Sequence, residues 1–444
     1  MRQNILLIVV DSLRYDKFFG PLKTAKTPNI DKLIDNGFIF TNTISSTDST
    51  YSSLGSLFSG KHPYNHQISW FNNHSKVINY FEFLKNNNYN LNGTFQNQSF
   101  FQTLSSIFDD VDLVDGQPYL RLFEGLGGKI LQRLEKIKNA EPWFYYIHLM
   151  DFHISKQLPD EYNNEDFGQT TWDKRLHILD SWIGKFLEKI ELKNTVIIIT
   201  SDHGEFDIDL DVDYGSIPKL QKFLKSIKSK SPKVIEPLGV DFFVFLRETK
   251  RKYVERKLKE HSADEELQQL SRRGKTILFD DVIRIPLLIS GGNVQHGMSN
   301  QQVRQIDIFP TIYDLLSIKN EKGFDGISLK PFFKKKDISD LIGYIESAPD
   351  PNANDELGEF VGIRTANFKF VRSRDNSKNR KTFLFDLKND PSEKINIAST
   401  KPDIVQEMES LLSKHRKHEN NLTPESDDEE ISKIKDELKK MGYI

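Results

Sequence analysis

The segment NILLIVVD, residues 4–11, decides the fold, because six apolar residues run without interruption into an aspartate. Two similar runs follow, WFYYIHLM at residues 143–150 and TVIIIT at residues 195–200. Short, nearly continuous apolar runs are typical of strands buried on both faces of a parallel sheet. Segments with helical spacing, residues 27–37 and 170–191, lie between them. This alternation predicts a doubly wound α/β fold.

An acidic residue follows each of the three runs. Asp11 follows the first, Asp151 the second, and Asp202 with His203 the third. A single aspartate after a strand ordinarily begins a turn. Active sites of open α/β sheets form beyond the carboxyl ends of the strands, so three acids in one register predict a shared acidic edge.

Composition narrows the classes of protein and of site. With 444 residues and 37% hydrophobic content, the chain is long enough and apolar enough for a packed core. The net charge of −3, from 61 basic and 64 acidic residues, argues against a nucleic-acid coating role. The chain has no cysteine, which excludes disulfides, thiolate metal sites and cysteine nucleophiles. Any metal must therefore bind oxygen and imidazole ligands.

Changes in composition predict the organisation of the chain. We expect a large α/β domain over residues 1–332, with a helical, Lys-rich insertion at about residues 206–273. A small C-terminal α+β unit is predicted for residues 333–415, because partial strand alternation there favours an antiparallel sheet. The charged tail, residues 416–444, is predicted to be helical or mobile. No apolar run reaches 18 residues, so we expect no membrane span and a cytoplasmic location.

The segment TDSTYSSLGSLFSGKHPYNH, residues 47–66, is rich in hydroxyl groups and then becomes helical. If Thr50 lies at the start of that helix, its oxygen faces exposed backbone amides and the positive end of the helix dipole. An anionic ester group is favoured at such a position. An ordinary Ser/Thr helix cap is the alternative interpretation of the same residues.

Eight motifs in order extend this interpretation over residues 4–398: NILLIVVDSLRYD, TPNIDKLIDNGFIFTN, SLFSGKHPYNH, TSDHGE, LFDDVIRIPLLISG, DIFPTIYDLL, DGISLKPF and LFDLKNDPSEKINIA. Together they resemble the sulfatase family of the alkaline phosphatase superfamily. The resemblance implies a mixed, mostly parallel sheet flanked by helices, with a small C-terminal antiparallel-sheet subdomain. It also implies a metal-dependent hydrolase or transferase acting on sulfate, phosphate or phosphonate esters.

The same resemblance implies the metal ligands and the nucleophile. Asp11, Asp202 and His203 match the ligands of one divalent ion, and Thr50, at the nucleophile position, is expected to bind it too. Carboxylate oxygens with one imidazole suit Mn²⁺, Mg²⁺, Ca²⁺ or Zn²⁺. Two-metal members usually carry another histidine near the position of Lys275, where this chain has none, so we expect a single ion.

Two further residues match groups that the family places on the substrate side. His153 lies in a segment similar to Met-Asp-Pro-His, and Lys275 lies just before the motif ILFDD, which begins at Ile277. Both are expected to hydrogen-bond the non-bridging oxygens of the ester or to protonate the leaving group. Asp151 is then a substrate or supporting contact and not a ligand.

The nucleophile segment departs from the sulfatase pattern Cys/Ser-x-Pro-x-Arg. Thr50, Ser52 and Leu54 stand where the pattern has Cys or Ser, Pro and Arg. Sulfatases oxidise the leading residue to formylglycine, which threonine cannot become, whereas the superfamily's phosphoglycerol transferases use threonine. We therefore predict cleavage or transfer of a small phosphate, phosphodiester or phosphonate ester. A sulfuric ester hydrolase, which a register with Ser49 or Ser52 as nucleophile would favour, and a catalytically weak binding relative are the alternatives.

Overall fold

The structure is a computed structural model that describes residues 2–69, 78–116, 119–153, 158–205, 278–319, 323–334, 338–347, 360–374 and 380–416. The predicted Lys-rich insertion, Lys275 and all but the first residue of the predicted tail lie outside these ranges. None of the helices within them combines the length and apolar character that a bilayer crossing requires.

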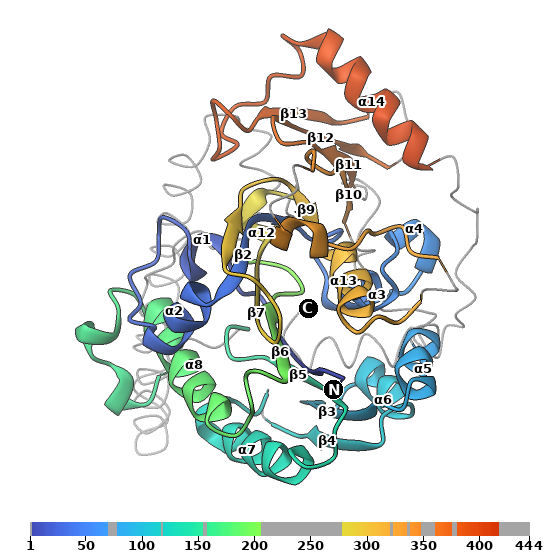
Figure 1. Cartoon of the computed structure of the whole chain (residues 1–444). Coiled ribbons are helices and arrows are strands. Elements are labelled where there is room, and N and C mark those ends of the chain that lie inside the picture. Colours follow the sequence, from blue (N-terminus) through green and yellow to red (C-terminus); the bar gives the residue numbers. More distant parts are fainter. Residues whose placement is uncertain are drawn as a thin grey trace, which may run out of the picture.

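A large sheet forms the centre of the molecule, with the strand order β4-β3-β5-β1-β6-β7-β2-β8 and with β9 also paired to β2 (Figure 1). Its strands are β1 Asn4–Val10, β2 Gly37–Ile44, β3 Asn90–Gln96, β4 Asp110–Val114, β5 Trp143–Leu149, β6 Thr195–Thr200, β7 Arg284–Gly291, β8 Gly297–Ser299 and β9 Val303–Arg304. β7 is antiparallel to both of its neighbours, and the other pairs are parallel. The predicted mixed, mostly parallel sheet is confirmed.

The three apolar runs of the sequence are the neighbouring central strands β5, β1 and β6. Every residue of these strands is buried. Leu7 pairs with Tyr146 on one side and with Ile198 on the other, so the strands are parallel and in register. Their carboxyl ends therefore meet at one edge of the sheet, and the acids that follow them in the chain are brought to that edge.

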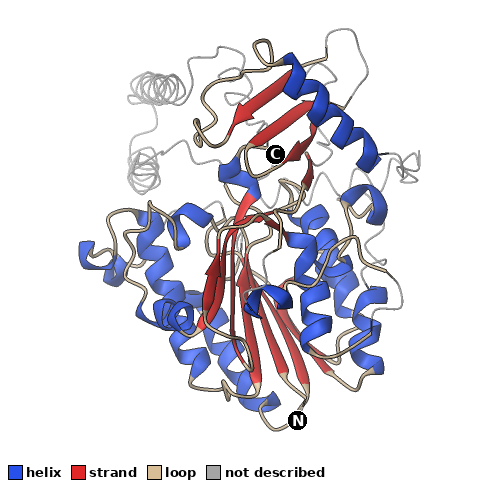
Figure 2. Cartoon of the chain, turned by 45° about the horizontal axis from the view of Figure 1, so that its top comes forward, coloured by secondary structure: helices blue, strands red, loops and turns tan. Residues whose placement is uncertain are grey.

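Helices cover both faces of the large sheet (Figures 1 and 2). One face carries α3 Thr50–Ser59, α5 Ile78–Asn86, α6 Ser99–Ser105 and α13 Ile308–Leu315, and the other carries α2 Pro28–Asp35, α7 Leu126–Ile137 and α8 Thr171–Leu187. Alternate residues of β1 enter the two cores, because successive side chains of a strand point to opposite faces. The helices predicted at residues 27–37 and 170–191 are found as α2 and α8.

Short helical elements complete the large unit. They are α1 Tyr15–Phe18, α4 Pro63–His66, α12 Asp280–Ile283 and the 3₁₀ turns η2 Leu122–Glu124, η3 Asp160–Tyr162, η4 Glu165–Phe167, η5 Gln305–Asp307 and η6 Lys330–Lys334.

A small antiparallel sheet lies beyond the end of the large sheet that is opposite the N-terminus (Figure 2). Its strands, in spatial order, are β10 Gly343–Glu346, β11 Phe360–Arg364, β12 Phe368–Ser373 and β13 Thr382–Asp386, and α14 Pro402–Arg416 packs against them. An isolated bridge between Thr47 and Glu346 connects β10 to the segment just before α3. The predicted C-terminal antiparallel sheet is thus present, next to the edge where the acids gather.

Candidate active site

Three side chains at the carboxyl edge of the large sheet form a group able to hold a metal ion. Asp11 follows β1 directly, and Asp202 and His203 come just after β6. One ligand atom from each of the three lies within 4.8 Å of the others, and all three residues are buried. The parallel register of β1 and β6 thus brings together residues almost 200 positions apart in the chain.

Thr50 is the first residue of α3, and its hydroxyl faces this group. Its Oγ1 lies 3.1 Å from Asp11 Oδ2, to which it donates, and 3.3 Å from His203 Nε2. The N-terminus of the helix carries a partial positive charge that stabilises negative charge on a nearby oxygen. The hydroxyl of Thr50 therefore lies beside both the group of Asp11, Asp202 and His203 and the N-terminus of α3.

The ring of His203 is oriented by its own loop. Its Nδ1–H donates to the carbonyl of Gly204 at 2.7 Å, which leaves Nε2 facing Thr50 and Asp202. Burial alone would lower the pKa of His203, but the charges of Asp202 and Asp11 raise it to about 9. The two carboxylates thus attract positive charge to this point.

The hydrogen bonds of Asp202 show whether a cation fits the group of Asp11, Asp202 and His203. Its Oδ1 accepts the backbone N–H of His203 at 2.8 Å and that of Ser12 at 3.3 Å. Its Oδ2 is buried and has no hydrogen-bond partner among the described residues. Burial and the neighbouring charge of Asp11 raise the pKa of Asp202. A buried oxygen without a partner, next to a second carboxylate and an imidazole nitrogen, fits a divalent cation.

Two more histidines surround Asp11. His153 Nδ1 donates to Oδ1 at 3.1 Å, and His148 Nε2 lies 3.8 Å from Oδ2. The other ring nitrogen of His148 is 2.8 Å from the hydroxyl of Tyr146. Burial would raise the pKa of Asp11, but the charges and hydrogen bonds of these histidines, with the charge of His203, hold it well below its ordinary value. Asp11 is thus kept as a carboxylate.

Ser12 adopts a backbone conformation that is uncommon outside glycine. Its φ of 61° lies in the left-handed region, where a Cβ is crowded. The hydroxyl donates to Asp11 Oδ1 at 2.8 Å, and the backbone N–H points to Asp202. The strained turn therefore links the two carboxylates of the group.

Three polar side chains hold the loop after β6 against α3. Ser53 Oγ and Ser45 Oγ donate to the carbonyl of Asp202 at 2.6 and 2.8 Å. Gln305 Nε2 donates to the same carbonyl at 2.9 Å and accepts from Ser53 at its Oε1. These contacts fix the position of Asp202 relative to Thr50, one helical turn before Ser53. The sequence interpretation missed all three, although the i, i+3 spacing of Thr50 and Ser53 places them on one helix face.

The structure brings together five of the residues singled out from the sequence, Asp11, Thr50, His153, Asp202 and His203. Asp151 lies outside the group of Asp11, Asp202 and His203, and its Oδ1 accepts the backbone N–H of Leu122 at 3.1 Å. The sequence interpretation also missed His148, although a lone histidine within the apolar strand β5 is a visible signal.

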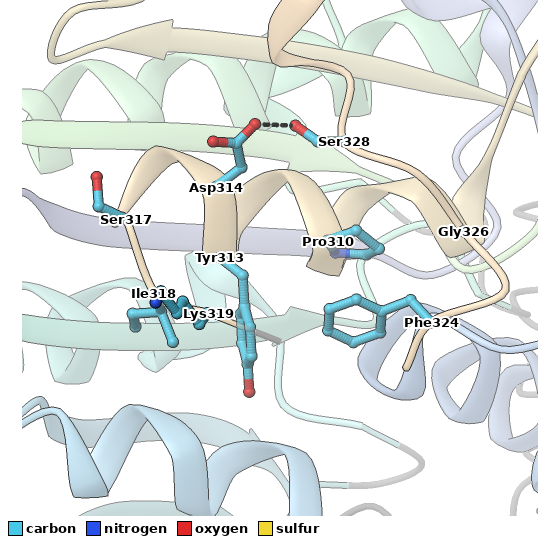
Figure 3. A pocket seen from close by; sticks show the side chains of 9 residues that line it. All are labelled: Pro310, Tyr313, Asp314, Ser317, Ile318, Lys319, Phe324, Gly326 and Ser328. Atoms are coloured by element: carbon cyan, nitrogen blue, oxygen red, sulfur yellow. Dashed lines mark hydrogen bonds between the residues drawn. The ribbon is translucent and has the colours of Figure 1, made fainter. Parts of the chain in front are cut away.

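A separate cavity of about 480 Å³ lies against α13, and its lining includes Tyr313, Asp314 and Phe324 (Figure 3). Phe324 also packs against Gly60, which follows α3 at the end opposite Thr50. The ten residues of α3 span about 15 Å, so the cavity is distinct from the site around Thr50.

Two family models match the chain. One described as Sulfatase covers residues 3–318, and one described as N-sulphoglucosamine sulphohydrolase, C-terminal, covers residues 273–418.

Curated relatives match a smaller region. An uncharacterized protein of Haemophilus influenzae is 29% identical over 205 residues, which are 46% of this chain and 32% of that protein. Arylsulfatase K of Danio rerio is 30% identical over 148 residues, which are 31% of this chain and 27% of that enzyme. The match therefore spans about a third or less of the length of these relatives.

A solved structure extends the likeness to nearly the whole fold. The phosphonate monoester hydrolase of Agrobacterium radiobacter superposes with a TM-score of 0.61 at 16% identity, over 94% of this chain and 96% of that one.

Proposed function

The chain belongs to the sulfatase family of the alkaline phosphatase superfamily, and on that basis we propose that it is a metal-dependent hydrolase or transferase of phosphate, phosphodiester or phosphonate esters, with Thr50 as its nucleophile. The observation that carries the proposal is the position of Thr50. Thr50 is the first residue of α3, and its Oγ1 lies within 3.3 Å of both Asp11 Oδ2 and His203 Nε2.

The chemistry of threonine favours phosphorus esters. A formylglycine nucleophile requires oxidation of a primary alcohol or thiol to an aldehyde, and the secondary alcohol of Thr50 cannot give one. An alcohol nucleophile is competent for phosphoryl transfer when its proton is readily lost. The helix N-terminus beside Thr50 supports both the alkoxide and the anionic oxygens of the ester.

Asp11, Asp202, His203 and Thr50 would hold one divalent cation, which when bound would lower the pKa of the Thr50 hydroxyl and offset the charge of the ester oxygens. The residues of the chain then divide the remaining work. Thr50 loses its proton to solvent and its Oγ forms a bond to phosphorus. The bond between phosphorus and the alcohol oxygen breaks, and the phosphoryl group is left on Thr50.

His153 acts on the leaving alcohol. Its Nδ1 is held by Asp11 at 3.1 Å, so the ring has a fixed orientation at the edge of the site. His153 supplies the proton that the departing oxygen takes up, and Lys275, as the resemblance implies, offsets charge on the ester oxygens. Water then cleaves the Thr50 ester in a hydrolase, whereas a second alcohol accepts the phosphoryl group in a transferase.

Sulfate esters are the second candidate substrate. Arylsulfatase K is among the curated relatives, and the family model is that of sulfatases. Transfer of sulfate to Thr50 would leave a threonine sulfate that cannot be expelled by collapse to an aldehyde, so water would have to attack that ester directly. This extra requirement is the reason for placing sulfate second.

A substrate panel tests the proposal. Wild type, Thr50→Ala and the matched control Thr50→Ser are assayed with Mn²⁺ or Mg²⁺ on 4-nitrophenyl phosphate, bis(4-nitrophenyl) phosphate, a phenylphosphonate ester and 4-nitrophenyl sulfate. We expect turnover of phosphorus esters, a loss of about 10³-fold or more in Thr50→Ala, and partial activity in Thr50→Ser, which keeps the hydroxyl. Sulfate turnover that survives in Thr50→Ala would refute the nucleophile assignment.

A further inference from the structure

Arg175 is a buried cation that forms no ion pair with any acidic side chain in the described part of the chain. It lies near the start of α8 and is only 6% exposed. Within the described ranges, its guanidinium makes no hydrogen bond or ion pair, and Nη2 is completely covered. Burying an uncompensated charge is strongly unfavourable, so a guanidinium kept in this state calls for a reason other than stability.

Arg133 provides the contrast within the same chain. It is 7% exposed, as deeply buried as Arg175. Its guanidinium pairs with Asp110 and with Asp112, the latter at 2.9 Å. Arg133 is thus neutralised by the fold itself, whereas Arg175 lacks such a partner among the described residues.

A second guanidinium and two carboxylates lie near Arg175. Burial and the charge of Arg121 lower the pKa of Arg175 to about 10, and the charges of Asp151 and Glu205 act in the opposite direction. Arg121 Nε and Asp151 Oδ2 are also buried without hydrogen-bond partners among the residues described. Arg121 pairs with Glu124 at 3.7 Å. Its Nε and the guanidinium of Arg175 nevertheless remain unused hydrogen-bond donors close to Asp151 in the part of the chain that the structure describes.

The cluster borders the candidate active site on two sides. Asp151 precedes His153 by two residues, and Glu205 follows His203 by two. Consecutive Cα atoms are 3.8 Å apart, so Asp151 and His153 are separated by less than about 8 Å along the backbone. An ester bound at Thr50 has its alcohol half on the side of His153. A group a few bonds along that alcohol would therefore reach the cluster around Asp151 and Arg175.

We propose that Arg175, together with Arg121, forms a second oxyanion subsite that binds a carboxylate, sulfate or phosphate group on the alcohol half of the substrate. A guanidinium suits such groups because its planar fork of donors matches two oxygens at once. The proposal rests on the proposed function and deepens it. The substrate is an ester whose alcohol carries another acidic group a few bonds from the scissile bond.

Binding to the full-length Thr50→Ala protein tests this subsite without requiring turnover. The probes are two matched pairs, 3-phosphoglycerate against glycerol 3-phosphate and 6-phosphogluconate against glucitol 6-phosphate, which differ only by a carboxylate in place of a CH₂OH group. By calorimetry we expect at least one acidic member to bind about tenfold more tightly than its neutral partner. Adding Arg175→Met should bring that ratio close to one.

The possible results distinguish an acidic group of the substrate from a free anion. They also distinguish failure of the subsite from failure of the proposed function. No acid preference in either pair, or a preference that persists in Arg175→Met, would overturn the inference. Tighter binding of glycerol 3-phosphate in the presence of acetate would also overturn it, because the subsite would then bind a separate anion and not an acidic group of the substrate. A preserved, Arg175-dependent preference in a protein that hydrolyses and transfers no ester would overturn the proposed function and leave the subsite standing.

Thermal unfolding excludes a purely structural role for Arg175. Arg133→Met removes a guanidinium from two carboxylates and should lower Tm by about 2 °C or more. Arg175→Met has the same burial and side-chain change, but should leave Tm unchanged or raise it, because an unpaired buried charge is removed. A fall in Tm as large as that of Arg133→Met would make Arg175 a structural residue and refute the subsite.

Discussion

The chemistry of the site depends on how Asp11 is held. Its two oxygens face different partners, Oδ1 toward His153 and Ser12 and Oδ2 toward Thr50 and His148. A carboxylate restrained on both oxygens loses little freedom when it binds a cation. Side chains that orient a ligand in this way typically change metal affinity by 10- to 100-fold.

His148 should therefore contribute to metal affinity although it is not expected to be a ligand. We expect His148→Gln to weaken Mn²⁺ binding, measured by calorimetry, by about tenfold or more, because Asp11 Oδ2 loses its neighbour. Tyr146→Phe removes only the hydrogen bond to His148 Nδ1 and should have a smaller effect. His66→Gln is the matched control, since His66 is equally buried but bonds to Ser56. An affinity in His148→Gln equal to that of the control would contradict this role.

At the scale of elements, the sequence predicts those strands and helices whose positions follow from the local spacing of apolar residues. The apolar runs correctly located the central strands β1, β5 and β6, because strands buried on both faces cannot contain many polar residues. The helical spacing correctly located α2 and α8. The acids at the strand ends then followed from the parallel register.

Features that depend on distant contacts could not be predicted. The antiparallel direction of β7 is set by its pairing with β6 and β2, not by its own apolar pattern. The hydrogen bond between Ser53 and Gln305 joins residues 252 positions apart. The lack of an ion pair for Arg175 among the described residues is equally invisible in the sequence, since it depends on where the fold places the neighbouring acids.

At the scale of the whole molecule, buried charges connect helix α12 of the large unit to strands β11 and β12 of the small sheet. Asp280 accepts two hydrogen bonds from Arg364, at 2.9 and 2.5 Å, and one from Lys369 at 3.2 Å. Lys369 also pairs with Glu393, whose Oε2 accepts the backbone N–H of Asp280 at 2.6 Å. Such a network fixes the docking of the two units in one geometry, but its desolvation is costly.

This network makes stability depend on pH through Glu393. Burial raises the pKa of Glu393 from 4.5 to about 7, so between these values the folded protein binds more protons than the unfolded chain. The free energy of unfolding should therefore decrease as pH rises from about 4.5 to about 7, by at most about 3 kcal/mol from this group.

Urea unfolding at several pH values checks this dependence. Glu393→Gln should show a smaller decrease than wild type, because its side chain does not titrate and only other buried acids such as Asp151, whose pKa is raised to about 6, still contribute. Glu407→Gln changes an exposed glutamate of the same unit and should follow wild type. Parallel curves for wild type and Glu393→Gln across this range would contradict the assignment.

The central claim, that Thr50 is the nucleophile, is tested most directly by trapping its ester. Wild-type protein with Mn²⁺ is mixed with 4-nitrophenyl phosphate, quenched rapidly in acid and digested, and the peptide containing Thr50 is sequenced by mass spectrometry. We predict one added phosphoryl group on Thr50 and none in Thr50→Ala. A phosphoryl group on Ser49 or Ser52, or undiminished turnover in Thr50→Ala, would contradict it.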